Sequence, residues 1–264
     1  MQDILKKVQI HMPFDMLWDR YLPILVKERI NPEISFNHDS IERFGSADFK
    51  KMAAMILDAG LTTTIHAPFM DLRPGALDPK IRQVTVDRIR QVFDLAPDFR
   101  PRSIVFHPSF DERYYVSTEA LWLENSIQTW RKFLPLAEEM GTLIALENVY
   151  ETNPGPLKAL LQSFTSPNIC FCFDTGHFNA FAKTPLDEWL RELGSLTGQL
   201  HLHDNHGATD EHLPVGEGNF PFNDLFRKLA EIGRHPIITL EAHSEKRLWQ
   251  TLGNIKNMKL LSSL

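Results

Sequence analysis

Leu143-Ile144-Ala145-Leu146-Glu147 is a short apolar run that ends in a carboxylate. Three later runs have the same form and end at Asp174, His201 and Glu241, all residue types that bind metal ions. Seven of eight such runs end in His, Asp or Glu, whereas a strand entering an ordinary loop more often meets Gly, Asn, Asp or Ser. The runs cover residues 8–11, 33–37, 63–66, 104–107, 143–147, 170–174, 199–201 and 237–241.

Amphipathic segments between these runs predict helices. Segments 48–59, 118–140 and 225–232 each stop at a glycine, and segment 79–95 carries apolar residues at helical spacing. Strands that alternate with helices, without hairpin signals, are typical of parallel sheets. A single eight-stranded α/β barrel needs about 250 residues. The chain has 264, so we expect an α/β fold with one (β/α)8 TIM barrel domain over residues 1–264.

The alternation of side chains along each strand tests this arrangement. If Asp174 points into the barrel, Phe171 and Phe173 face the helices, and if Glu147 points inward, Ala145 lies beneath it. Small residues then fall inside and bulky residues outside, as expected for a barrel filled by layers of side chains. In this architecture the loops that follow the strands build the active site.

The two cysteines, Cys170 and Cys172, lie on the same strand face as Asp174. We interpret them as small residues that fill the barrel beneath a ligand. A zinc-binding pair is a minor alternative, and a disulfide between them is not favoured because they lie within one strand.

Composition indicates an ordinary globular protein. With 43% hydrophobic and 23% charged residues, the chain can bury a full core. Lys6 and Lys7 interrupt any apolar segment at the start, and no apolar stretch is long enough to span a bilayer. We therefore expect a cytoplasmic protein without membrane contact. The net charge of −6 disfavours nucleic acid slightly, although a local basic patch can bind it on an acidic protein.

Each acidic or histidine side chain at a strand end also has an ordinary interpretation. A single carboxylate there usually caps a helix, and a single histidine usually makes an ordinary hydrogen bond. To explain this sequence, that ordinary interpretation would have to hold independently at nine positions. Clustered carboxylates also repel one another unless a cation is present, so the nine positions together favour a metal site. The nine positions are His66, His107, Glu147, Asp174, His177, His201, Asp210, His212 and Glu241.

Motifs at the strand ends resemble those of the xylose-isomerase-like barrel superfamily. It includes sugar-phosphate isomerases and epimerases, ketose epimerases, inosose-processing enzymes and endonuclease IV. The order of the motifs is specific for the superfamily and only weakly specific for the substrate. They are Thr64-Ile65-His66-Ala67-Pro68-Phe69, Phe106-His107-Pro108, Leu146-Glu147-Asn148, Phe173-Asp174-Thr175-Gly176-His177, His201-Leu202-His203-Asp204, Asp210-Glu211-His212, Gly216-Glu217-Gly218 and Leu240-Glu241.

The resemblance implies two sets of metal ligands. In the isomerases and epimerases, one divalent metal is held by residues that match Glu147, Asp174, His201 and Glu241. Endonuclease IV binds three zinc ions, and its additional ligands match His66, His107, His177, Asp210 and His212. An enzyme with one metal can keep these additional residues as substrate contacts. We expect one bound Zn, Mn, Mg or Co ion, and the nine matches permit up to three.

Two departures from endonuclease IV favour a small polyol over DNA. The repair enzymes carry an Asn-Thr-Ala-Gly run where this chain reads Asn148-Val149-Tyr150-Glu151, and a cysteine where it has Gly176. Phe69 and Met70 do match positions that enter the DNA duplex, but the surrounding motif is also common among the sugar-processing relatives. No stretch interleaves basic and aromatic residues in the way that a duplex backbone requires.

The site chemistry favours proton transfer on an open-chain sugar. A divalent cation would bind a carbonyl and its neighbouring hydroxyl and stabilise an enediolate as a proton leaves carbon. The resemblance implies that Glu147 and Glu241, on opposite sides of the barrel mouth, are the acid/base pair. His177, one turn after Asp174, would orient or polarise a substrate oxygen.

Two further substrate contacts are predicted. His203 shares the parity of His201 and could replace it as a ligand. The glycines flanking Glu217 permit close approach to a ligand, and a phosphate could rest on amides at the start of the following helix, with a tight turn before Pro221 as the alternative. No Walker or dinucleotide glycine signature is present, so no nucleotide or nicotinamide cofactor is expected.

Three functions follow from these patterns. The first is a metal-dependent isomerase or epimerase of a sugar or sugar phosphate, the second is a zinc phosphodiesterase that cleaves abasic DNA, and the third is a barrel that binds metal and polyol without turnover. We favour the first. The sequence leaves open the sugar, its phosphorylation, the metal and a homo-oligomeric state.

Overall fold

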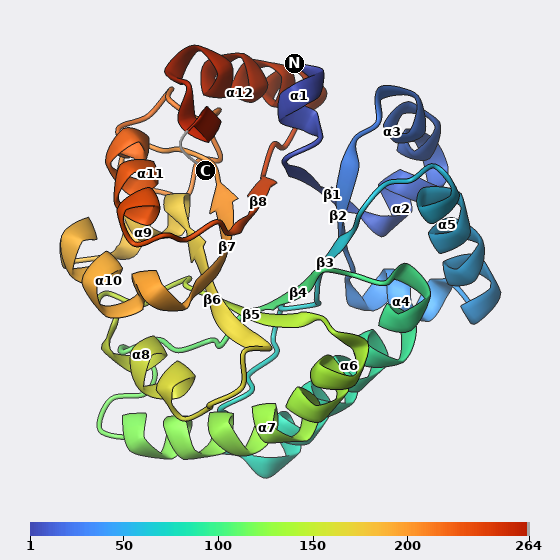
Figure 1. Cartoon of the computed structure of the whole chain (residues 1–264). Coiled ribbons are helices and arrows are strands. Elements are labelled where there is room, and N and C mark those ends of the chain that lie inside the picture. Colours follow the sequence, from blue (N-terminus) through green and yellow to red (C-terminus); the bar gives the residue numbers. More distant parts are fainter. Residues whose placement is uncertain (263–264) are drawn as a thin grey trace.

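A computed structural model describes residues 1–262 of the chain. All strand pairs are parallel, and the strands close into a barrel in sequence order, surrounded by helices (Figure 1). This confirms the (β/α)8 barrel expected from the sequence. The strands are β1 Gln9–Pro13, β2 Asn31–Ser35, β3 Thr64–His66, β4 Ser103–Phe106, β5 Leu143–Glu147, β6 Ile169–Asp174, β7 Thr197–Leu202 and β8 Ile237–Leu240.

Four helices correspond to the segments singled out in the sequence, namely α5, α6, α7 and α11. Helix α6 runs past its expected end because buried Phe99 continues its apolar face beyond Pro97. Eight further α-helices lie within the described residues 1–262. The α-helices are α1 Gln2–Leu5, α2 Phe14–Met16, α3 Leu22–Glu28, α4 His38–Arg43, α5 Ser46–Asp58, α6 Pro79–Phe99, α7 Glu119–Met140, α8 Gly155–Gln162, α9 Thr175–Phe181, α10 Leu186–Leu193, α11 Phe222–Glu231 and α12 Glu245–Met258. Short π or 3-10 turns are η1 Leu17–Tyr21, η2 Gly194–Leu196 and η3 Leu260–Ser262.

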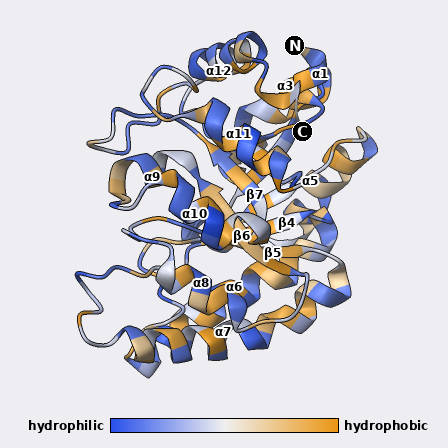
Figure 2. Cartoon of the chain, turned by 60° about the vertical axis from the view of Figure 1, so that its left-hand side comes forward, coloured by the Kyte–Doolittle hydropathy of each residue, from blue (hydrophilic) through white to orange (hydrophobic). Residues whose placement is uncertain are grey.

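The side chains of β6 divide between the two layers as the strand alternation predicts. Phe171 and Phe173 face outward, with ring centroids 6.2 and 6.3 Å from that of Trp189 on α10. Cys170 and Cys172 point inward and form a small buried cluster with residues of β4 and β5. Both thiols are free, and burial raises the pKa of Cys170 to about 12, so it is a neutral filler. Figure 2 shows the hydrophobic colour of β5 and β6 at the centre, with hydrophilic residues along α10 and α11.

Parallel strands carry the predicted ligands to one end of the barrel. Asp174 on β6 pairs in register with His201 on β7, and His201 pairs with Thr239 on β8. Residues at the same level of neighbouring strands point to the same side, so these side chains meet in the barrel interior. Within residues 1–262, no helix combines the length and apolar character that crossing a bilayer requires.

Candidate metal centre

His201 lies at the middle of the candidate site, and three carboxylates surround its Nδ1 atom. Glu241 Oε1 lies 2.9 Å from this nitrogen, Glu147 Oε2 lies 3.3 Å away and Asp174 Oδ2 lies 3.8 Å away. All four side chains are buried. The structure therefore brings together the four residues that match the single-metal set.

The end of β6 is held in place by a pair of hydrogen bonds from the residue that follows β5. The Asn148 side chain donates to the Asp174 carbonyl at 3.1 Å and accepts from the Asp174 amide at 2.9 Å. The Asp174 carboxylate also caps α9 by accepting from the backbone N–H of His177. This cap aims its second oxygen toward the centre of the barrel mouth.

Glu33 is a member of the site that sequence reasoning missed. Its Oε1 lies 3.0 Å from His201 Nε2, on the side of the ring opposite the three carboxylates. Its Oε2 accepts from the Gln199 amide at 2.6 Å and from the hydroxyls of Thr64 and Thr239, both at 2.8 Å. The alternation of side chains along β2 could have indicated that Glu33 points inward. The candidate ligands were selected at strand ends, so Glu33 was not among them.

The position of Glu33 favours the tautomer of His201 that carries a proton on Nε2. An anionic oxygen near that nitrogen stabilises an N–H there, which leaves the Nδ1 lone pair facing the other carboxylates. A histidine that binds a metal through one nitrogen commonly gives its other N–H to a carboxylate in this way.

We expect Glu33→Gln to weaken divalent-metal binding by roughly 10- to 100-fold, because a neutral amide holds the His201 tautomer less strongly. Metal titration measures the affinity, and long-range ¹H–¹⁵N correlation of the imidazoles reports the tautomer. Glu42→Gln, at an exposed residue on α4, is the control. Unchanged metal affinity with an altered melting temperature would show that Glu33 has a structural role only.

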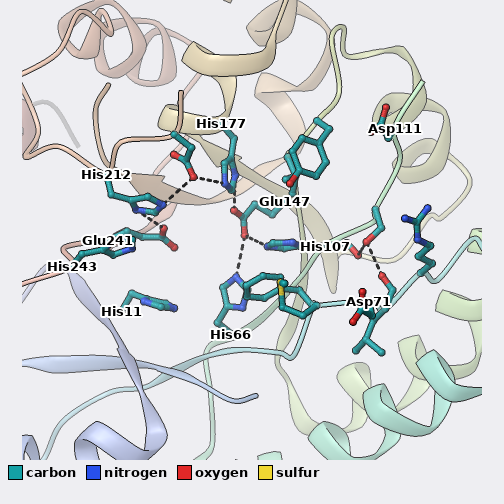
Figure 3. A pocket seen from close by; sticks show the side chains of 18 residues that line it. His11, His66, Asp71, His107, Asp111, Glu147, His177, His212, Glu241 and His243 are labelled. Atoms are coloured by element: carbon teal, nitrogen blue, oxygen red, sulfur yellow. Dashed lines mark hydrogen bonds and ion pairs between the residues drawn. The ribbon is translucent and has the colours of Figure 1, made fainter. Parts of the chain in front are cut away.

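A second group of donors adjoins Glu147. The Nε2 atoms of His66 and His107 lie 3.3 and 3.4 Å from Glu147 Oε2. His177 approaches the other oxygen, with its Nδ1 atom 3.1 Å from Glu147 Oε1. Both His66 and His107 line the barrel mouth, where strand parity places them (Figure 3).

A third group of donors lies around Asp210. The Nε2 atoms of His177 and His212 lie 3.5 and 3.0 Å from Asp210 Oδ2. His203 also belongs to the cluster: its Nε2 lies 3.0 Å from Asp174 Oδ1 and 3.9 Å from Glu241 Oε2, and its ring stacks on His212 with centroids 3.9 Å apart. The nine positions singled out in the sequence thus form one continuous cluster.

The unsatisfied atoms of this cluster fit a bound cation. Within residues 1–262, Glu147 Oε2, His201 Nδ1 and Asp210 Oδ1 are buried side-chain atoms without a hydrogen-bond partner. Buried polar atoms normally find partners, so these unpaired atoms are available to bind a cation. Imidazole nitrogen and carboxylate oxygen suit Zn, Mn or Co. Sets of three or more such residues have ligand atoms within 4.8 Å of one another.

Protonation of His201 balances the carboxylates in the absence of metal. Burial acts against charge, yet the neighbouring negative groups, including Glu33 and Glu147, raise the pKa of His201 well above its usual value. Burial likewise opposes ionisation of Glu147 and Glu241, but the His201 charge holds the pKa of both well below the usual range. A metal must displace this proton, so its apparent affinity increases with pH.

Glu151, beside the cluster, is a buried carboxyl with a raised pKa. Burial raises its pKa from the ordinary value of 4.5 to about 7, although its Oε2 accepts from the Val149 amide at 2.7 Å. The folded state therefore binds a proton that the unfolded state releases between these values. Stability from this group is present below pH 4.5 and is lost as the pH rises to 7.

We expect Glu151→Gln to remove this loss, because the amide stays neutral at all pH values. The variant and the native protein differ in their free energy of unfolding, and from pH 4.5 to pH 8 this difference should change by about 3 kcal/mol in favour of the variant. Urea unfolding of the metal-free proteins at both pH values measures the difference. Glu139→Gln, at an exposed position of α7, is the control, and equal pH dependence in native and Glu151→Gln proteins would contradict the assignment.

The loop containing Glu217 forms a tight turn around Asp204. The Asp204 carboxylate accepts from the amides of Gly216 at 3.0 Å, Gly218 at 2.9 Å and Phe220 at 3.2 Å. These amides are therefore occupied, and the segment around Glu217 forms the tight turn that was expected as the alternative. Glu217 itself is exposed, accepts from Asn254 at 3.0 Å and does not line the cavity that contains the cluster.

That cavity has a volume of about 460 Å³, and Figure 3 shows its histidines and carboxylates pointing toward one another. Two further histidines line it, His11 at the end of the first apolar run and His243 after β8. His243 stacks on His212 with ring centroids 3.9 Å apart. Sequence reasoning did not assign either residue to the site, although His11 had the same strand-end signal as His66.

Residues 33–261 match the family described as the xylose isomerase-like TIM barrel, and the chain belongs to this family. An uncharacterized protein of Methanocaldococcus jannaschii is 34% identical over 185 residues, which cover 67% of this chain and 63% of that protein. Fructoselysine 3-epimerase of Escherichia coli O157:H7 is 24% identical over 170 residues, or 62% of this chain and 61% of that enzyme. The chain thus spans less than two thirds of the length of both relatives.

The solved structures include a close match in fold. A D-tagatose 3-epimerase-like protein superimposes with a TM-score of 0.80 over 96% of this chain and 98% of that chain, at 24% sequence identity. At this identity the likeness shows a shared fold.

Proposed function

We propose that the protein is a divalent-metal-dependent sugar epimerase or isomerase. The observation that carries the proposal is that Glu147, at the end of β5, and Glu241, directly after β8, line one cavity and both approach His201. Two carboxylates that reach a substrate from different sides of a barrel can remove a proton from carbon and return one. The names of relatives such as fructoselysine 3-epimerase support the same class of reaction.

Glu147, Asp174, His201 and Glu241 would hold the cation. When bound, the cation would polarise a substrate carbonyl and so acidify the neighbouring C–H bond. Glu147 would then accept a proton from carbon on one face of the substrate, while Glu241 supplies a proton to the other face. In an isomerase the same pair would move a proton between adjacent carbons.

His177 would orient the substrate within this arrangement. Its Nδ1 lies 3.1 Å from Glu147 and its Nε2 lies 3.5 Å from Asp210. The adjacent carboxylates raise the pKa of His177 well above its usual value, against the effect of burial. The cationic ring can therefore donate a hydrogen bond to a substrate oxygen.

A second candidate function is supported by the groups around His107 and Asp210. Together with the central set they supply the donors of three adjoining metal sites, which is the ligand set implied for a zinc phosphodiesterase. Metal content separates the two candidates, because one tightly bound ion favours the epimerase and three zinc ions favour hydrolysis.

The test is a screen of ketoses for deuterium uptake from heavy water, with metal content measured on the same sample. The same preparation is assayed for cleavage of abasic DNA. Uptake that depends on a divalent metal supports the proposal. Cleavage without uptake would establish the phosphodiesterase, and metal and polyol binding without either reaction would establish a binding protein.

A further inference from the structure

A second cavity opens beside the candidate metal centre, between helices α3 and α12. It has a volume of about 600 Å³, compared with about 460 Å³ for the cavity over the metal cluster. His11 and His243 line both cavities. The two cavities are therefore adjacent and share these imidazoles, which Figure 3 shows near Glu241.

The walls of this second cavity, which we call the α3–α12 groove, are mainly apolar. Buried Ile10 and Leu25 line its inner side, and Met16 and Trp249 line it while 45% and 37% exposed. Partly exposed large apolar side chains around a hollow typically mark a binding site. The remaining wall residues include Met12, Pro13, Ile24, Ile30, Ala242 and Leu248.

Apart from the imidazoles, the charged side chains that line the two cavities are mainly acidic. Among the described residues that line them, Arg73 carries the one guanidinium or ammonium group, and Asp71 and Asp111 line the same cavity. The α3–α12 groove itself carries the carboxylate of Glu245. The amides of Gly216 and Gly218 in the nearby loop already donate to Asp204.

We propose that the substrate is an unphosphorylated sugar with an apolar substituent, which lies in the α3–α12 groove. The sugar would occupy the cavity over Glu147 and Glu241, and the substituent would pass His11 and His243. This inference rests on the proposed function, since it assigns the sugar to that site. The groove removes apolar surface of the substituent from water, which strengthens binding in proportion to the area buried.

Calorimetry on the metal-loaded protein tests the inference. The ligands are 1-O-benzyl- and 6-O-benzyl-D-fructose, the corresponding methyl ethers, D-fructose and D-fructose 6-phosphate. We expect at least one benzyl ether to bind about tenfold more tightly than its methyl ether or better, because its ring reaches apolar walls. D-fructose 6-phosphate should bind no more tightly than D-fructose.

Two variants on α3 form a matched pair. Ile24 lines the groove, so Ile24→Trp should fill it and abolish the benzyl preference while leaving D-fructose binding unchanged. Val26 is 37% exposed and does not line the groove, so Val26→Trp should keep the preference. Trp249→Ala should reduce the preference for benzyl over methyl ethers. It should leave the oligomeric state, measured as molar mass in solution, unchanged.

Three results would overturn the inference: equal affinity for benzyl and methyl ethers, a benzyl preference that persists in Ile24→Trp, or tenfold tighter binding of the phosphate. A change in oligomeric state with Trp249→Ala, without an ether preference, would instead identify the groove as a subunit interface. A groove-dependent preference without deuterium exchange into any of these sugars would refute the proposed function and leave the binding site standing.

Discussion

Glu147→Gln and Glu241→Gln are each expected to lower turnover by roughly two to four orders of magnitude. Glutamine keeps the shape of the side chain and one oxygen that can contact a metal. It lacks the basicity needed to accept a proton from carbon. The loss should therefore appear in the proton-transfer rate even in protein that retains its metal.

Deuterium uptake from heavy water, compared at equal metal occupancy, measures this loss. Glu217→Gln is the matched control, because Glu217 follows a neighbouring strand but does not line the cavity. If both central variants exchange protons at the native rate while the same preparation cleaves abasic DNA, the phosphodiesterase replaces the epimerase as the better explanation.

His201→Ala is expected to empty the metal site and to reduce activity by roughly three orders of magnitude or more. The reason is geometric, since His201 Nδ1 lies within 3.8 Å of all three carboxylates of the central set. His201→Ala leaves these carboxylates close together without a positive charge, and their mutual repulsion then disfavours the arrangement. Removal of metal by a chelator should reproduce the loss of activity in the native protein.

Elemental analysis and metal titration of His201→Ala measure the outcome, and His235→Ala provides a control outside the cavity. Readdition of metal should restore the chelated native protein but not the variant at the same concentration. Full activity in the variant, with native metal content, would remove His201 from the ligand set.

The barrel could be predicted from the sequence because its signal is local and repeated. Phe171 and Phe173 alternate with Cys170 and Cys172, and this alternation alone separates the helix-facing layer from the interior. Once parallel strands are inferred, polar residues at their carboxyl ends must meet at one mouth. The placement of Asp174 beside His201 follows from that rule and from the strand register.

Glu33 shows where local patterns become insufficient. Its importance comes from His201, which lies 168 residues away in the chain, and from hydroxyls and an amide on three other strands. No spacing rule connects these residues. Their contacts exist only because the closed barrel brings distant strands face to face.

The loop around Glu217 and the α3–α12 groove were likewise decided by tertiary structure. Glycines on both sides of Glu217 are compatible with a ligand site and with a tight turn, and only the structure shows that their amides donate to Asp204 within such a turn. The groove joins the first and last parts of the chain, because β1 and β8 are neighbours in the closed barrel. Periodicity along the sequence determined which residues face inward, whereas barrel closure determined which of them share a proton, a cavity or a ligand.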